Sequence, residues 1–215
     1  MSLSRPVKFF GSIAIILGVI MTAIYFVTMP IREYAERQQH QVDQAVADTL
    51  PVLSTVPDFT LTDENGKVVT LADLKGKIWL ADMIFTKCES ICPTMSSNFS
   101  ALQSSLDPDI RFVSFSVDPE YDKGEVLRAY AKRFNADATR WTFVTGDRPA
   151  IFSLAKTGFL LGVDSVGLSP DNLITHSEKF VLIDRHGRMR SYYDGTDSTS
   201  AVKIKADIER LKKEA

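Results

Sequence analysis

Cysteine and histidine are scarce in this chain of 215 residues, which contains two Cys and three His. The low cysteine count excludes a disulfide-dense miniprotein, because such small domains depend on many cysteines. No block of Lys and Arg occurs, and the formal net charge is −2. A nucleic-acid binder is therefore disfavoured, since phosphate binding requires a basic face. Internal repeats and low-complexity stretches are also lacking, and a hydrophobic content of 45% fits an ordinary globular domain.

One long segment, from Phe9 to Met29, contains no charged residue. At about 1.5 Å of rise per residue, a helix of this length reaches about 30 Å, the thickness of the hydrocarbon core of a bilayer. A cleaved signal peptide is the alternative, but its apolar region spans only about 7–15 residues and precedes a small-residue cleavage site. Thr28-Met29-Pro30 offers no such site. The sequence therefore predicts one uncleaved transmembrane helix at residues 9–29.

The charges around this segment predict its orientation. Arg5 and Lys8 precede it without an acidic neighbour, whereas the basic residues behind it are accompanied by Glu33 and Glu36. The positive-inside rule therefore favours residues 1–8 as a short cytoplasmic N-terminus, with the rest of the chain outside. Because two of the 25 basic residues precede the segment, 23 basic and 27 acidic residues follow it, a net charge of −4. We expect a polar stalk at residues 30–53 and a mildly acidic domain at residues 54–215.

Strand and helix patterns alternate through the predicted domain. Asn65-Gly66 between two apolar runs predicts a β-hairpin near its N-terminus. Further strands are expected at residues 77–85, 110–117 and 141–145, and in a second hairpin at residues 180–184 and 189–193. Helices are expected around residues 95–106, 123–135, 147–158 and 204–211. This order predicts an α/β sandwich with parallel and antiparallel parts.

Both cysteines lie in Cys88-Glu89-Ser90-Ile91-Cys92-Pro93, where a predicted buried strand ends and a helix begins. Free N–H groups and partial positive charge at a helix N-terminus stabilise a thiolate and lower the pKa of a cysteine. The spacing of four places both sulfurs on one face of a helical turn, near enough for a disulfide or one metal ion. Three interpretations follow. They are a structural disulfide, which stabilises little because its loop is short, a redox-active dithiol, and a metal site with further ligands.

The histidines differ in their predicted surroundings. His176 lies on a loop just before a strand, whereas His186 occupies a hairpin turn and His40 the stalk. Taken alone, His176 is most simply a hydrogen-bonding loop residue. Together with two thiolates it forms a compact soft site suited to copper, since thiolate selects Cu(I) and imidazole binds either oxidation state. Structural zinc normally requires a fourth protein ligand, and none is obvious in the sequence.

Three motifs occur in a characteristic order. They are Cys-x-x-x-Cys-Pro after a strand, Ser116-Val117-Asp118-Pro119-Glu120, and Thr175-His176-Ser177 before the strand at residues 180–184. Together they resemble the Sco (SenC/PrrC) family of copper-binding cytochrome oxidase assembly proteins, over about residues 54–213. The resemblance implies a membrane-tethered thioredoxin-like fold with an N-terminal β-hairpin. It also implies that one copper ion, Cu(I) or Cu(II), is bound by Cys88, Cys92 and His176.

The resemblance further implies a role in building the dinuclear CuA centre of cytochrome c oxidase subunit II. The protein would deliver copper, reduce the cysteine pair of the subunit, or do both, with an upstream copper donor and a thiol reductant as further partners. Without an Arg/Ser-rich presequence, the N-terminus favours a bacterial cytoplasmic membrane, with the domain on its extracytoplasmic face. The alternatives are a thiol-disulfide oxidoreductase, in which the cysteine pair Cys88 and Cys92 works alone, and a redox or copper sensor.

The chain departs from the familiar pattern between the cysteines, because Glu89 and Ser90 stand where well-known members have Pro and Asp. The three implied ligands are unchanged. Asp82 lies inside an otherwise apolar strand, at the offset where thioredoxins keep a buried carboxylate near their active thiols. It is a candidate proton acceptor, or else a hydrogen-bonded strand residue. Asp118 is a candidate for orienting the copper ligands, or else caps the turn before the next helix.

Overall fold

The computed structural model describes residues 49–161 and 177–214, together with six positions in the N-terminal segment. By its internal contacts the chain divides into two units, Met1–Asp48 and Thr49–Ala215. In the described part of the chain, no helix combines the length and apolar character that a bilayer crossing requires. The predicted anchor at residues 9–29 lies outside the described residues except for Met21, Tyr25 and Met29. The transmembrane helix therefore stays a prediction.

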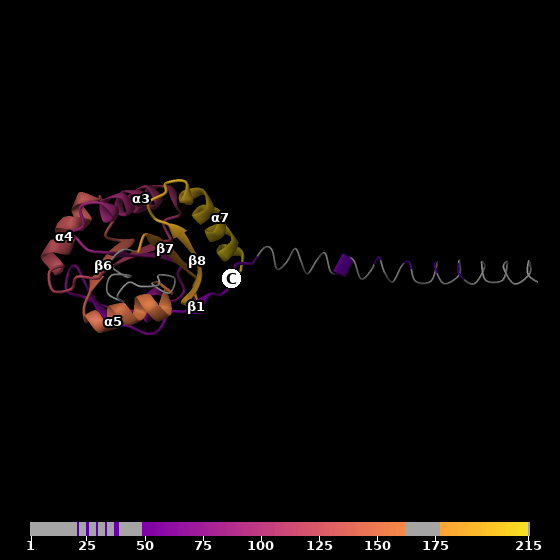
Figure 1. The fold of residues 1–215 in the computed structure, drawn as a ribbon, viewed down its shortest axis with the longest axis horizontal. Helices are drawn as coiled ribbons and strands as arrows, with labels where there is room; N and C mark the ends of the chain where they lie inside the picture. Colours follow the sequence, from indigo (N-terminus) through magenta and orange to yellow (C-terminus); the bar gives the residue numbers. More distant parts are fainter. Residues whose placement is uncertain are drawn as a thin grey trace, which may run out of the picture. The chain divides into compact units, whose positions relative to one another are not determined.

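One mixed sheet of eight strands forms the centre of the unit Thr49–Ala215, in the order β1-β8-β7-β4-β5-β6-β2-β3 (Figure 1). The strands are β1 (Ser54–Thr55), β2 (Thr60–Asp63), β3 (Val68–Thr70), β4 (Trp79–Ile84), β5 (Arg111–Ser116), β6 (Trp141–Thr145), β7 (Lys179–Ile183) and β8 (Arg188–Asp194). The three strands β4, β5 and β6 run parallel, whereas the remaining neighbours pair antiparallel. The prediction of parallel and antiparallel parts is confirmed.

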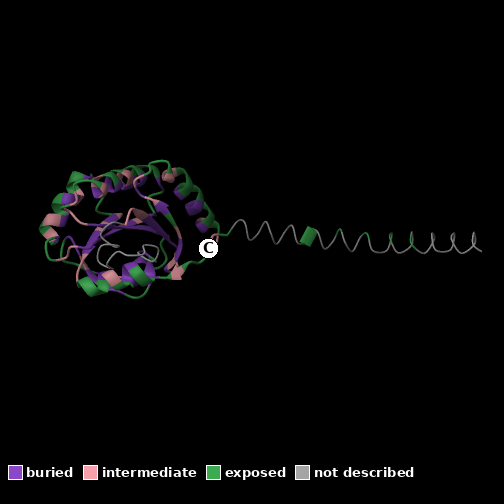
Figure 2. Ribbon diagram, in the orientation of Figure 1, coloured by how far each residue is buried: buried purple, intermediate pink, exposed green. Residues whose placement is uncertain are grey.

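Helices cover both faces of this sheet. They are α2 (Leu71–Leu74), α3 (Ile91–Ser105), α4 (Gly124–Arg133), α5 (Arg148–Ser153) with the π-helical turn η1 (Leu154–Gly158), and α7 (Ser200–Lys213). Buried side chains of α3, α4 and α7 share one apolar cluster, and those of α2, α5 and η1 share another. Figure 1 accordingly shows α3, α4 and α7 on one side of the sheet and α5 on the other. Figure 2 shows buried strands between helices whose outer faces are exposed.

Strand β4 lies at the centre of both clusters, and all six of its residues are buried. Trp79 and Met83 belong to the cluster under α5, while Leu80 and Ile84 belong to the cluster under α3. Because side chains alternate between the faces of a strand, Asp82 points to the same face as Leu80 and Ile84. The one charged residue of this strand therefore faces the helix that carries Cys92.

An aromatic cluster holds α3 against the sheet. The ring of Phe99 lies 4.3 Å from Phe180, 5.1 Å from Phe112 and 5.5 Å from Trp141, measured between ring centroids. All four side chains are almost completely buried. Large aromatic side chains contribute strongly to packing. This contact fixes the axis of α3, and with it the position of the helix N-terminus beyond the end of β4.

Two hairpin turns and a helix cap form where the sequence predicts them. Gly66 and Gly187 adopt φ values of 84° and 74° in the β2–β3 and β7–β8 turns, a conformation that glycine tolerates best. Both predicted hairpins are therefore confirmed. Asp147 caps α5, since its carboxylate accepts the N–H of Ala150 at 3.1 Å. The short strand β1, which pairs with β8, was not predicted.

Candidate functional site

Cys88 lies in the segment that connects β4 to α3, and Cys92 lies in the first turn of α3. A tight turn, residues 85–88, follows β4 and is closed by the N–H of Cys88, which donates to the carbonyl of Phe85 at 3.1 Å. Below we call residues 85–88 the cysteine turn. Cys92 is the second residue of α3. The predicted placement of both cysteines, after a buried strand and at a helix N-terminus, is therefore confirmed.

The sulfur of Cys88 takes the place of a helix-capping acceptor. Ser90, the N-cap residue of α3, makes no side-chain capping bond, and Cys88 Sγ instead accepts the N–H of Cys92 at 3.3 Å. Partial burial acts to raise the pKa of Cys88, but the N–H groups of Cys92, Ser90 and Ile91 outweigh it, so the pKa is lowered. Because a thiolate is the reactive and metal-binding form, this half-exposed sulfur can act as a nucleophile or as a metal ligand.

Cys92 has the opposite character. Its side chain is 4% exposed, and burial raises the pKa of its thiol to about 12. The charges of Cys88 and Asp82 act in the same direction, whereas a hydrogen bond involving the Phe85 backbone acts against it. Both cysteines are free thiols in this structure. The pair therefore consists of an accessible sulfur that ionises easily and a buried sulfur that holds its proton.

Asp82 lies inside the core, and its charge acts on the buried thiol of Cys92. It is 1% exposed, and burial raises the pKa of its carboxyl to about 7, although the neighbouring hydroxyl of Ser114 acts to lower it. Neither carboxylate oxygen forms a hydrogen bond of ordinary geometry with the described residues. A buried carboxyl without such partners is costly to ionise, so it exchanges its proton near neutral pH. This placement supports its candidacy as a proton acceptor.

A buried hydroxyl pair completes the polar interior of this region. The hydroxyl groups of Ser96 in α3 and Tyr130 in α4 are 2.9 Å apart. Burial raises the pKa of Tyr130, and the charges of Cys92 and Asp82 raise it further. Tyr130 lies in the helix predicted at residues 123–135, and no sequence signal connects it with the cysteines.

The segment after β5 holds two aspartates with different surroundings. Asp118 is partly exposed, and its carboxylate forms no hydrogen bond or ion pair within the described residues. The N-cap residue of the following helix α4 is Lys123. Asp122, which sequence analysis missed, is instead fully buried. Its carboxylate accepts hydrogen bonds from Thr86 in the cysteine turn, so this acidic residue contacts the described part of the site.

His176, the third predicted ligand, lies in the range 162–176, outside the described residues. Among the residues that the structure does describe, no three His, Cys, Asp or Glu side chains converge on a common point suitable for a metal ion. The described part of the site therefore supplies two sulfur donors. Their soft thiolate chemistry suits Cu(I).

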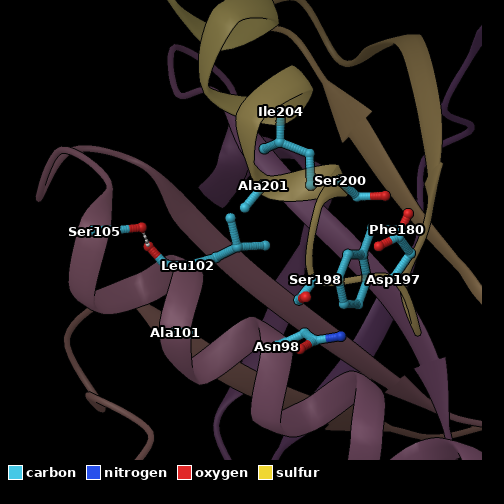
Figure 3. Close-up of a pocket in the computed structure, with 10 residues that line it drawn as sticks. All are labelled: Asn98, Ala101, Leu102, Ser105, Phe180, Asp197, Ser198, Ser200, Ala201 and Ile204. Atoms are coloured by element: carbon cyan, nitrogen blue, oxygen red, sulfur yellow. Dashed lines mark hydrogen bonds between the residues drawn. The ribbon is translucent and has the colours of Figure 1, made fainter.

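A surface cavity of about 240 Å³ lies away from the cysteines, between α3 and α7 (Figure 3). Figure 3 shows Leu102, Ala201 and Ile204 on its walls, with Asn98 and Asp197 at its polar end. Of the predicted site residues that the structure describes, Asp82, Cys88, Cys92 and Asp118, none lines it. The cavity is therefore separate from the candidate site.

A mixed sheet covered by helices on both faces, with a cysteine pair where a central parallel strand meets a helix, defines a thioredoxin-like domain. The sequence model of the SCO1/SenC family matches residues 47–213. The SCO1 protein homolog of Bacillus subtilis is 35% identical over 162 residues, which cover 74% of this chain and 83% of that protein. The chain belongs to the SCO1/SenC family, as the three motifs indicated.

Solved structures agree with this assignment. A SCO1/SenC family lipoprotein from Bacillus anthracis matches with a TM-score of 0.66 and 36% identity, over 75% of this chain and 97% of that one. BsSco, a Sco family cytochrome c oxidase assembly protein with a disulfide switch, matches with a TM-score of 0.66 and 34% identity, over 76% and 97%. ScoI of Bradyrhizobium japonicum, solved with copper bound, matches with a TM-score of 0.59 and 26% identity, over 74% and 99%.

Proposed function

We propose that the thiolates of Cys88 and Cys92 and the neutral imidazole of His176 bind one copper ion, which the protein carries to the CuA centre of cytochrome c oxidase subunit II. The observation that carries this proposal is the pair of sulfurs at the N-terminus of α3, one of which already has a lowered pKa. Family membership supports copper as the cargo, because a related ScoI holds copper. The assembly role is supported by the relative BsSco.

The two sulfurs lose their protons at different stages of copper binding. Cys88 ionises first, because three N–H groups surround its sulfur. Cys92 loses its proton only when the metal replaces it, since its own pKa is raised to about 12. Metal binding to thiols and imidazole releases protons, so copper affinity falls at acid pH. A half-exposed Cys88 allows an incoming partner to exchange one ligand at a time.

The proposed setting is the extracytoplasmic face of a bacterial cytoplasmic membrane. Residues 9–29 would span the bilayer, residues 1–8 would face the cytoplasm, and residues 30–48 would form the stalk, because residues 49–53 of the predicted stalk belong to the folded unit. Support comes from the uncharged segment of the sequence and from the relative in Bacillus anthracis, which is a lipoprotein. In spheroplasts of the host, added protease should digest residues 49–215. Protection of that domain until the membrane is broken would contradict the orientation.

Copper titration of the purified, reduced, full-length chain tests the proposed ligands. Wild type should bind one copper ion with thiolate-to-copper absorption, and Cys88→Ser, Cys92→Ser and His176→Ala should each weaken binding by about tenfold or more. His186→Ala is the matched control, because His186 lies exposed in the β7–β8 turn. Equal copper affinity of wild type and His176→Ala would contradict the three-ligand site.

Thiol-disulfide exchange is the second candidate, favoured by the unequal acidity of the two cysteines. The Cys88 thiolate would attack a partner disulfide and form a mixed disulfide, releasing one partner thiolate. Cys92 would then lose its proton to Asp82 and attack the Cys88 sulfur. This releases the second partner thiolate and leaves a Cys88–Cys92 disulfide. Reduction of a partner at equal rates by wild type and His176→Ala, without copper binding by either, would favour this function over copper delivery.

A further inference from the structure

Asp122 joins the cysteine turn to the segment that follows β5. Its carboxylate accepts the N–H of Thr86 at 3.0 Å and the hydroxyl of Thr86. It also accepts the hydroxyl of Ser116, the last residue of β5, at 2.6 Å. Thr86 lies two residues before Cys88. One carboxylate therefore holds three donors from two neighbouring strand ends.

The burial of these groups makes the arrangement specific. Asp122 and Ser116 are both completely buried. Hydrogen bonds to an ionised carboxylate are shorter and stronger than those between neutral groups, and a buried polar group that loses its partner is left unsatisfied. No other acceptor contacts the N–H of Thr86 among the described residues. The position of the cysteine turn is therefore tied to Asp122.

Further contacts fasten the same two segments. The ammonium of Lys87 lies 3.6 Å from the centre of the Tyr121 ring, and the N–H of Val117 donates to the carbonyl of Ile84 at 2.9 Å. The turn that carries Asp122 is itself closed, because the N–H of Asp122 donates to the carbonyl of Asp118 at 2.8 Å. The residues that lead into Cys88 are thus held from one side by residues 116–122.

We propose that Asp122 is a positioning residue of the copper and thiol site, acting through Thr86 to hold the turn that presents Cys88. This inference rests on the proposed function for its copper readout. The carboxylate acts as an acceptor of three hydrogen bonds. It neither touches the copper ion nor takes part in proton transfer.

Two variants of the full-length chain test the proposal. Asp122→Asn keeps the shape but turns an NH₂ group toward donors, and Thr86→Val removes one hydroxyl without changing charge. We expect Asp122→Asn to weaken copper binding by about 10–100-fold, as loss of a residue that orients a ligand does, and Thr86→Val by less. The reduced form should also lose its preferred geometry. The equilibrium constant against dithiothreitol should therefore favour the Cys88–Cys92 disulfide about fivefold or more in Asp122→Asn.

Asp207→Asn is the matched control, because Asp207 is a buried carboxylate that accepts the hydroxyl of Tyr193 at 2.9 Å within the α7 contact. It should lose stability while keeping copper affinity and the disulfide equilibrium. If Asp122→Asn and Thr86→Val behave like this control, Asp122 is merely structural and the proposal fails. Should Asp122→Asn not fold, Thr86→Val decides alone. If wild type binds no copper, the proposed function fails, and the disulfide equilibrium still tests the positioning role.

Discussion

The two thiols of the site differ most in how they meet the backbone of α3. Cys88 accepts an N–H of the first helical turn from outside the helix, while Cys92 is buried within that turn. The same element therefore lowers the pKa of one cysteine and, through burial, raises that of the other to about 12. The carboxyl of Asp82 lies close enough to the buried thiol to raise its pKa.

This difference predicts selective alkylation. In the reduced, metal-free chain at pH 7, iodoacetamide should modify Cys88 at least about 100-fold faster than Cys92, because the thiolate is the nucleophile and only Cys88 is accessible. Mass spectrometry of peptides after timed quenching measures both rates. The rate for Cys92 should stay low in the Cys88→Ser variant. Comparable rates for the two cysteines would contradict the assignment.

Asp82 predicts a pH dependence of stability. Its pKa in the folded state is about 7, above its ordinary value of 3.8, so the folded chain keeps this proton to a higher pH than the unfolded chain does. Wild type should therefore lose stability as the pH rises from about 4 to about 7 and then level off. Asp82→Asn removes this loss, on the order of a few kcal/mol. Urea unfolding of reduced protein at pH 5 and pH 8 measures it.

In that experiment the advantage of Asp82→Asn over wild type should be larger at pH 8 than at pH 5. Asp73→Asn serves as the comparison, since Asp73 is an exposed carboxylate whose pKa is lowered by the hydroxyl and N–H of Thr70. The difference in stability between Asp73→Asn and wild type should be the same at pH 5 and at pH 8. A constant difference between Asp82→Asn and wild type would show that Asp82 does not titrate in this range.

Sequence reasoning located the cysteines and Asp82 because each breaks a local pattern: a thiol pair at a strand-to-helix junction, and a charge inside an apolar strand. Asp122 breaks no pattern. It follows a turn-forming Asp-Pro segment, where an aspartate is ordinary, and its partner Thr86 is 36 residues away. Its burial arises only when β4 and β5 pair in parallel, which local sequence does not encode.

At the scale of elements, α3 depends on packing beneath it. Its N-terminus carries the site, and Phe99 in its middle contacts three other aromatic rings. Phe99→Ala should lower the free energy of unfolding by about 3–5 kcal/mol, because it leaves a cavity in a packed core. Val202→Ala on α7 is the control, since Val202 is 77% exposed and should change stability by less than about 0.5 kcal/mol. Equal effects in chemical denaturation would contradict this account of the core.

The elements themselves were largely predictable, because strands β4 to β6 and helices α3, α4 and α7 have periodic apolar residues and well-placed turn residues. Strand β1 was not, since Ser54 and Thr55 carry no apolar pattern and pair only with a distant strand. Residues that precede β1 also contact the folded domain. Arg190 in β8 donates to the carbonyls of Leu50 and Pro51 and forms an ion pair with Glu214 at 2.7 Å. Such contacts depend on the folded arrangement rather than on local sequence.

At the scale of the whole molecule, the oxidation state of the cysteines should control loading with copper. A Cys88–Cys92 disulfide removes both thiolates, so the oxidised chain should bind copper at least about 100-fold more weakly than the reduced chain. Copper titration before and after treatment with dithiothreitol measures the difference. The copper affinity of the Cys88→Ser variant should not change on treatment with dithiothreitol. Equal affinity of oxidised and reduced wild type would exclude these sulfurs as ligands.

Transfer of copper to the CuA domain of cytochrome c oxidase subunit II tests the central claim most directly. The domain is supplied metal-free with its cysteines already reduced, so that thiol reduction by the chain has no effect on the outcome. We expect copper-loaded wild type to produce the CuA absorption spectrum, and His176→Ala, mixed with the same copper, to produce it much more slowly. Two results together would contradict the account. In the first, CuA forms no faster from the copper-loaded chain than from free copper. In the second, the metal-free reduced chain restores CuA formation in a domain whose cysteines are oxidised.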